Sequence, residues 1–141
     1  MIYLDSSLLL ELYLSQPRAD EAQRVLAFDE PKVSSWLLAI EVPVVLRRAL
    51  GRDPRNRSLL ADALVRFDED LKAVSLIERL AGVADRVRHE ERFSECRTLD
   101  ALHAAAALEI QAMAGHPVRM ATFDRRLGEL AKSLGLSLAA A

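Results

Sequence analysis

The sequence has little of several residue types that mark common classes of protein. Its single cysteine, Cys96, can form no internal disulfide bond and has no companions for a zinc site. No run of about eighteen apolar residues is present, so no transmembrane helix is expected. The N-terminus also lacks the basic start and the apolar stretch of a signal peptide. We therefore expect a cytoplasmic protein that makes no contact with a membrane.

Glycine-based motifs are missing as well. The five glycines form no phosphate-binding GxxxxGK(S/T) loop, no dinucleotide-binding GxGxxG loop and no GxSxG nucleophile turn. Aromatic residues make up only 5% of the chain, so no platform for stacking nucleic-acid bases stands out. These absences direct attention to the charged residues.

The composition is that of one globular domain. The 141 residues are 51% hydrophobic and 28% charged, which is enough for a buried core within a single domain over residues 1–141. The net charge of −2 does not indicate a nucleic-acid-binding protein, yet 16 of the 19 basic residues are arginine, which suits bidentate phosphate contacts. Arg47 and Arg48 begin the segment RRALGRDPRNR, which is either a phosphate-facing patch or a consequence of an arginine-rich composition.

Short apolar segments alternate with amphipathic ones along the chain. Strands are predicted at residues 2–4, 32–35, 71–76, 118–122 and 136–140, and helices at residues 6–14, 17–28, 36–50, 57–67, 77–92, 97–115 and 124–135. This alternation predicts an α/β fold in which a short parallel β-sheet is flanked by helices on both faces. In such sheets ligands bind beyond the carboxyl ends of the strands.

Three acidic residues fall near that edge of the predicted sheet. Asp5 follows the first strand, Asp124 comes just after the fourth, and Asp100 lies in the first turn of a helix for which Thr98 is the expected cap. Each acid also has an ordinary structural role, because carboxylates cap helices and favour the positive end of the helix dipole. Taken one at a time, these acids do not identify a site.

Glu41 is harder to explain in this way. The residues three and four positions away on its helix are all apolar: Leu37, Leu38, Val44 and Val45. A lone ionised carboxylate in a hydrophobic stripe is costly, so Glu41 is either neutral or reaches a cation at the edge of the sheet. Pro43 removes one backbone donor beside it and either aims Glu41 toward that edge or only relieves packing.

Four acids that converge at one edge would suit a hard divalent cation, because Mg²⁺ prefers oxygen ligands. His103 follows Asp100 by one helical turn, so the DALH sequence could present two ligands on one face. A packed or supporting histidine is the interpretation we favour, since no other histidine or cysteine accompanies it.

Four segments in order resemble the PIN-domain ribonucleases, and most closely the VapC toxins of bacterial toxin–antitoxin pairs. They are DSS after the first strand, the glutamate of SSWLLAIEV, the helix start RTLDALHAAAA and the junction ATFDRRL. The resemblance spans essentially the whole chain and implies a PIN-like, Rossmann-like α/β/α sandwich. Residue by residue, the acidic site of the family falls on Asp5, Glu41, Asp100 and Asp124.

The resemblance also implies an activity and partners. It implies an endoribonuclease dependent on Mg²⁺ or Mn²⁺ that cleaves structured RNA such as tRNA or rRNA, inhibiting translation until a VapB-like antitoxin neutralises it. It further implies a homodimer. Asp5 and Asp100 would hold the main ion directly or through water, with Asp124 and Glu41 completing its surroundings.

Neighbouring residues receive supporting roles. Ser6 and Thr122 match the hydroxyl positions of the family, and both could equally serve as plain helix caps. Arg97 and Arg125 lie beside the acids in sequence and are candidates for contacts with the RNA backbone, as are the more distant Arg47 and Arg48.

Other functions are compatible with parts of this pattern. One is an RNA-processing nuclease of the same fold that is not a toxin, and another is a catalytically silent module that binds RNA or protein. A phosphorylated receiver domain fits less well, because it needs an acid pair after the first strand and a lysine at the end of the last.

Overall fold

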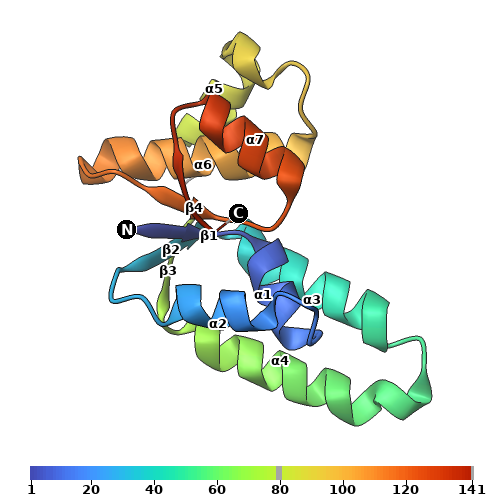
Figure 1. Cartoon of the computed structure of the whole chain (residues 1–141). Helices are drawn as coiled ribbons and strands as arrows, with labels where there is room; N and C mark the ends of the chain where they lie inside the picture. Colours follow the sequence, from blue (N-terminus) through green and yellow to red (C-terminus); the bar gives the residue numbers. More distant parts are fainter. Residues whose placement is uncertain (79–80, 141) are drawn as a thin grey trace.

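A parallel sheet of short strands lies at the centre of the computed structural model, which describes residues 1–78 and 81–140 (Figure 1). Its strands are β1 (Ile2–Leu4), β2 (Lys32–Ser35), β3 (Val74–Ile77), β4 (Arg119–Ala121) and β5 (Ser137–Ala140). They pair in the order β3-β2-β1-β4-β5, and all the pairs are parallel. The predicted parallel α/β fold is confirmed, with the first strand in the middle of the sheet.

Helices cover both faces of the sheet (Figure 1). One layer contains α1 (Ser6–Tyr13), α2 (Ala19–Leu26), α3 (Leu37–Leu50) and α4 (Arg57–Leu71), and the other contains α5 (Ala81–His89), α6 (Thr98–Ala114) and α7 (Arg125–Ser133). Two short 3-10 helices, Pro54–Asn56 and Glu91–Phe93, lie in the connections. No helix in the described part of the chain is both long and apolar enough to span a membrane.

The core is divided by the sheet into two hydrophobic clusters. Tyr3 on β1 packs into the cluster beneath α6 and α7, whereas Ile2 and Leu4 pack into the cluster beneath α1 to α4. This division follows from the strand, because successive side chains point to opposite faces. The alanines at positions 104–107 are all buried, and their small side chains let α6 lie close to the sheet.

Several predicted boundaries were wrong by a few residues. The helix predicted over 77–92 is shorter in the described residues, because Ile77 belongs to β3 and α5 begins at Ala81; positions 79 and 80 lie outside the described residues. Helix α4 continues to Leu71, where a strand had been predicted to start. Arg97, and not Thr98, is the residue that caps α6.

Two features of the helices bear on the position of the site residues. Helix α3 runs continuously through Pro43 and positions Glu41 in its second turn. Helix α6 ends at Gly115, as predicted, in a left-handed conformation with φ of 65°. Asp100, the acidic residue in the first turn of α6, therefore lies at the opposite end of that helix, where it lines one cleft with Asp5 and Asp124.

Candidate metal centre

Asp5 is fixed in place by the junction between two neighbouring strands. Its backbone N–H donates to the carbonyl of Ala121 at 3.0 Å, which sets the Asp5 side chain beside Thr122. Its carboxylate Oδ2 accepts hydrogen bonds from the Thr122 hydroxyl at 2.8 Å and from the Ser7 hydroxyl and backbone N–H at 2.5 and 3.2 Å. With Oδ2 held by three donors, the orientation of the buried carboxylate is fixed and Oδ1 is directed toward His103.

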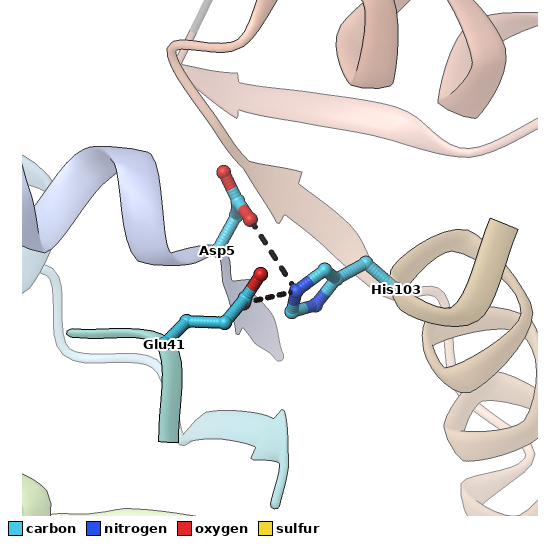
Figure 2. A group of neighbouring side chains, drawn as sticks. All are labelled: Asp5, Glu41 and His103. Carbon is cyan, nitrogen blue, oxygen red and sulfur yellow. Dashed lines mark hydrogen bonds and ion pairs between the residues drawn. The ribbon is translucent and has the colours of Figure 1, made fainter. Parts of the chain in front are cut away.

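Glu41 meets His103 across the two helical layers (Figure 2). The Glu41 Oε2 lies 2.6 Å from His103 Nε2, and Asp5 Oδ1 lies 3.8 Å from the same nitrogen. On the other side of the ring, Nδ1 is 2.8 Å from the Tyr3 hydroxyl, which donates to Ser35 Oγ at 3.1 Å. Because the hydrogen of the Tyr3 hydroxyl is used toward Ser35, its oxygen can accept from Nδ1.

These contacts favour the charged form of His103. Burial alone lowers the pKa of the imidazole, but the hydrogen bond to Glu41 and the negative charges of Asp5, Glu41 and Asp100 outweigh it and raise the pKa above its ordinary value. Both ring N–H groups of an imidazolium have acceptors here. The acids around His103 therefore favour its positively charged form.

Asp100 and Asp124 complete a cleft of about 340 Å³, which Asp5, Glu41 and His103 also line. Partial burial and the nearby carboxylate of Asp124 raise the pKa of Asp100, and Arg97 only partly offsets this effect. Asp124 caps α7, since its Oδ1 accepts from the backbone N–H groups of Arg126 and Leu127. All four predicted acids thus line one cleft, and negative charge accumulates in it.

The other predicted residues lie at different distances from this cleft. Ser6 and Arg97 line it, and Thr122 contacts Asp5 directly. Arg125 is exposed, lines a neighbouring cleft and lies 3.9 Å from Glu129. Arg47 and Arg48 are exposed in the last turn of α3 and do not line the acidic cleft.

Three features of the site were not found by sequence reasoning. The hydroxyl that bonds Asp5 within the DSS segment belongs to Ser7, and its Oγ also accepts from the backbone N–H groups of Phe123 and Asp124 at 2.9 and 3.2 Å. The apolar stripe around Glu41 is only half buried, because the Val44 side chain is 44% exposed. The partner of Glu41 is His103, a contact over 62 residues of sequence that helical spacing does not reveal.

The side chains suit a hard divalent cation. Asp5, Glu41 and His103 each present one potential ligand atom, and these atoms lie within 4.8 Å of one another. Asp100 and Asp124 add further carboxylates on the cleft wall. Because Mg²⁺ and Mn²⁺ favour carboxylate oxygens, the donor set fits such an ion.

The chain is similar to known proteins over nearly its whole length. The sequence model of the PIN domain matches residues 2–133. Ribonuclease VapC46 of Mycobacterium tuberculosis (strain ATCC 25618 / H37Rv) is 32% identical to the chain over 139 residues, which cover 99% of this chain and 96% of that protein. Ribonuclease VapC45 of Mycobacterium tuberculosis (strain CDC 1551 / Oshkosh) is 29% identical over 142 residues, covering 100% of this chain and 96% of that protein.

Proposed function

Because this chain belongs to the PIN domain family, we propose that it is a divalent-metal-dependent endoribonuclease and the toxin of a toxin–antitoxin pair. The similarity to ribonuclease VapC46 over nearly its whole length supports this function. The observation that carries the proposal is the convergence of Asp5, Glu41, Asp100 and Asp124 on one cleft at the carboxyl edge of the sheet.

We assign different roles to the four acids. Asp5 and Asp100 are the main ligands, and Asp124 and Glu41 complete the surroundings of the ion. When bound, Mg²⁺ or Mn²⁺ would supply a more acidic water and positive charge for the scissile phosphate. Thr122 and Ser7 hold the Asp5 carboxylate in one orientation, and Ser6 lies on the cleft wall where it can bond water or RNA.

Basic residues would bind the RNA backbone. Arg97 lines the cleft beside Asp100, so its guanidinium can contact a phosphate next to the cleavage site. Arg125 lies one residue beyond Asp124, and Arg47 and Arg48 are two further exposed arginines in the last turn of α3. Their contribution would be sequence-independent affinity that falls with rising salt.

Replacing the main ligands tests the chemistry. Asp5→Asn and Asp100→Asn keep the size of each side chain and remove its charge, so each is expected to lower RNA cleavage by at least about a hundredfold in Mg²⁺ or Mn²⁺. The matched control is Asp68→Asn, an exposed acid on α4, which should cleave as the unchanged chain does. EDTA should abolish cleavage by both the control and the unchanged chain. Full cleavage by both site variants, confirmed to be folded, would reject the proposal.

The substrate we propose is structured RNA, such as tRNA or rRNA, in the cytoplasm. Expression of the chain should then stop growth and translation, and new RNA ends mapped after induction should gather at one or a few sites. Growth without arrest, together with cleavage in vitro, would favour the RNA-processing nuclease that is not a toxin.

A VapB-like antitoxin is the proposed partner, and a homodimer is the proposed assembly. Co-expression with the antitoxin encoded beside the gene should restore growth, and the purified complex should cleave RNA more slowly than the chain alone. Light scattering on a size-exclusion column measures the mass of the free chain and checks the dimer directly.

A further inference from the structure

A second cleft shares Asp124 with the acidic one. It has a volume of about 330 Å³, and α7, β5, the junction that follows β4 and the residue before α2 contribute to its wall. Thr122 contributes to its wall and also bonds Asp5, and Asp124 lines both clefts. A chain bound across Asp124 would therefore pass directly from one cleft into the other.

The wall of this second cleft carries a flat cationic surface. The guanidinium carbon of Arg18 lies 3.7 Å from the centre of the Phe123 ring, so the two planar groups are in contact. Arg18 also donates to both carboxylate oxygens of Glu21, at 2.8 and 2.9 Å, which fixes the plane of the guanidinium. Nucleic-acid bases stack on aromatic rings and on arginine planes of this kind.

The charges of the two clefts differ. The acidic cleft collects four carboxylates against Arg97 and His103. The second cleft is lined by Arg18, Arg125 and Lys132 together with Asp124 and Glu129, and Arg18 is paired with Glu21. Arg125 and Glu129 are 3.9 Å apart and largely exposed, so their pairing is weak and leaves Arg125 able to reach a phosphate.

The geometry points to the second cleft as a subsite for one nucleotide of the RNA substrate, next to the phosphate that is cleaved. This inference rests on the proposed ribonuclease function and adds specific contacts to it. The base stacks on the surface formed by Arg18 and Phe123, and the phosphate on its far side meets Arg125 and Lys132. The acidic cleft then receives the scissile phosphate with its cation.

Binding of a short single-stranded RNA oligonucleotide in EDTA tests the subsite, because without a divalent cation no cleavage occurs. The paired variant Arg125→Ala with Lys132→Ala should bind about tenfold more weakly by fluorescence anisotropy, with the dependence on salt reduced by roughly one to two phosphate contacts. Phe123→Leu keeps the apolar volume and should weaken binding by about tenfold with the salt dependence unchanged.

The matched control removes two charges elsewhere. Arg24→Ala with Arg88→Ala changes two exposed arginines, on α2 and α5, that line neither cleft, and should bind RNA as the unchanged chain does. Equal affinity and equal salt dependence for the two paired variants would overturn the subsite. The subsite is also overturned if Arg125→Ala with Lys132→Ala keeps the affinity of the unchanged chain for RNA but loses its affinity for an acidic peptide.

Failure of the proposed function gives a different result. If the unchanged chain cleaves no RNA with Mg²⁺ or Mn²⁺, while the oligonucleotide still loses affinity in Arg125→Ala with Lys132→Ala, the subsite stands as an RNA-binding site and the nuclease proposal fails. If the chain cleaves RNA and that variant binds like its control, only the subsite fails.

Discussion

At the residue scale, Ser7 and Ser6 differ in their relation to Asp5. The Ser7 hydroxyl donates to the Asp5 carboxylate, whereas Ser6 lines the cleft. Ser7→Ala removes a 2.5 Å hydrogen bond to Asp5 Oδ2, so the carboxylate loses one of its fixed donors. We expect Ser7→Ala to reduce RNA cleavage and the affinity for Mn²⁺ by about ten- to a hundredfold. A titration of cleavage rate against Mn²⁺ concentration measures both effects.

Ser6→Ala is the matched comparison, because it makes the same change one residue earlier. Ser6 lines the cleft but is not among the donors that the structure describes at Asp5 Oδ2. Its removal should change the Mn²⁺ dependence by less than about threefold. Equal losses in both variants, or a larger loss in Ser6→Ala, would contradict the role of Ser7.

The raised pKa of Asp100 makes a prediction about stability without metal. Burial and the charge of Asp124 make the ionised carboxylate unfavourable in the folded protein, whereas in the unfolded chain Asp100 has an ordinary pKa. At pH values above the raised pKa, the folded state bears the whole free-energy cost of the ionised Asp100 carboxylate. Asp100→Asn should therefore stabilise the chain in EDTA at neutral pH, by about 2 °C in Tm. As pH falls from the raised to the ordinary pKa, the folded state takes up the proton first, the cost disappears, and the advantage of asparagine disappears with it.

Thermal unfolding in EDTA at neutral pH and near pH ~4 checks this sign. Asp68→Asn on α4 controls for the general loss of one negative charge and should show little advantage at either pH. A destabilised Asp100→Asn at neutral pH would mean that the carboxylate is stabilised by the fold, contrary to its environment.

The sequence could predict which acids share the site, but not how their atoms meet. Asp5 and Asp124 were found because each follows an apolar strand, and the carboxyl ends of parallel strands share one edge. The contact of Glu41 with His103 depends on two helices from opposite layers, and no local pattern encodes it. The choice of Ser7 over Ser6 depends on the exact direction of the first turn of α1, which spacing alone leaves open. That the four acids act as ligands stays a prediction.

At the scale of elements, Gly82 on α5 faces the carboxylate of Glu109 on α6. A Cβ atom at Gly82 would clash with Glu109 Oε1 and lie 2.7 Å from its Cδ, while Glu109 accepts from Arg86 at 2.9 Å. Gly82→Ala must therefore displace Glu109 from Arg86, and we expect it to lower the free energy of unfolding by about 1 kcal/mol. Chemical denaturation measures the change.

In a variant that lacks the Glu109 side chain, we expect Gly82→Ala to have the opposite effect on stability. In Glu109→Ala the obstacle is gone, and Gly82→Ala should then stabilise the chain by up to about 1 kcal/mol, because alanine favours helix more than glycine does. A loss of the same size in both backgrounds would show that contact with Glu109 is not the reason for glycine at this position.

The order of the elements was predictable, and their ends were less so. The short segments at β1 and β2 were identified to the residue, because segments of this length suit buried strands and are too short for stable helices. The ends of α4 and α5 were misplaced because Leu71, the last residue of α4, was assigned to the apolar segment that follows it, and Ile77, the last residue of β3, was assigned to the helix that follows it. The cap of α6 at Arg97 was missed because it makes no side-chain hydrogen bond to the helix, so propensity favoured the neighbouring threonine.

At the scale of the whole molecule, the candidate metal centre joins the two helical layers. Glu41 comes from α3 on one face of the sheet, Asp100 and His103 come from α6 on the other, and Asp5 lies between them at the end of the central strand (Figures 1 and 2). Carboxylates gathered there repel one another when no cation is bound, and the contact of Glu41 with His103 opposes this repulsion across the layers. Binding of a cation would change this repulsion into attraction across the sheet.

We therefore expect Mg²⁺ or Mn²⁺ to raise the thermal stability of the entire domain, and not only of the cleft. At a cation concentration a hundredfold above Kd the gain is about 2.7 kcal/mol, which corresponds to several degrees in Tm for a chain of this size. Potassium chloride in EDTA should give a smaller increase, because it screens the repulsion without linking the layers. Asp5→Asn should respond to potassium chloride and lose most of its response to Mn²⁺, whereas Asp68→Asn should keep both. If the Tm of the unchanged chain is the same in Mn²⁺ and in EDTA at equal ionic strength, the acids do not hold an ion that connects the two layers.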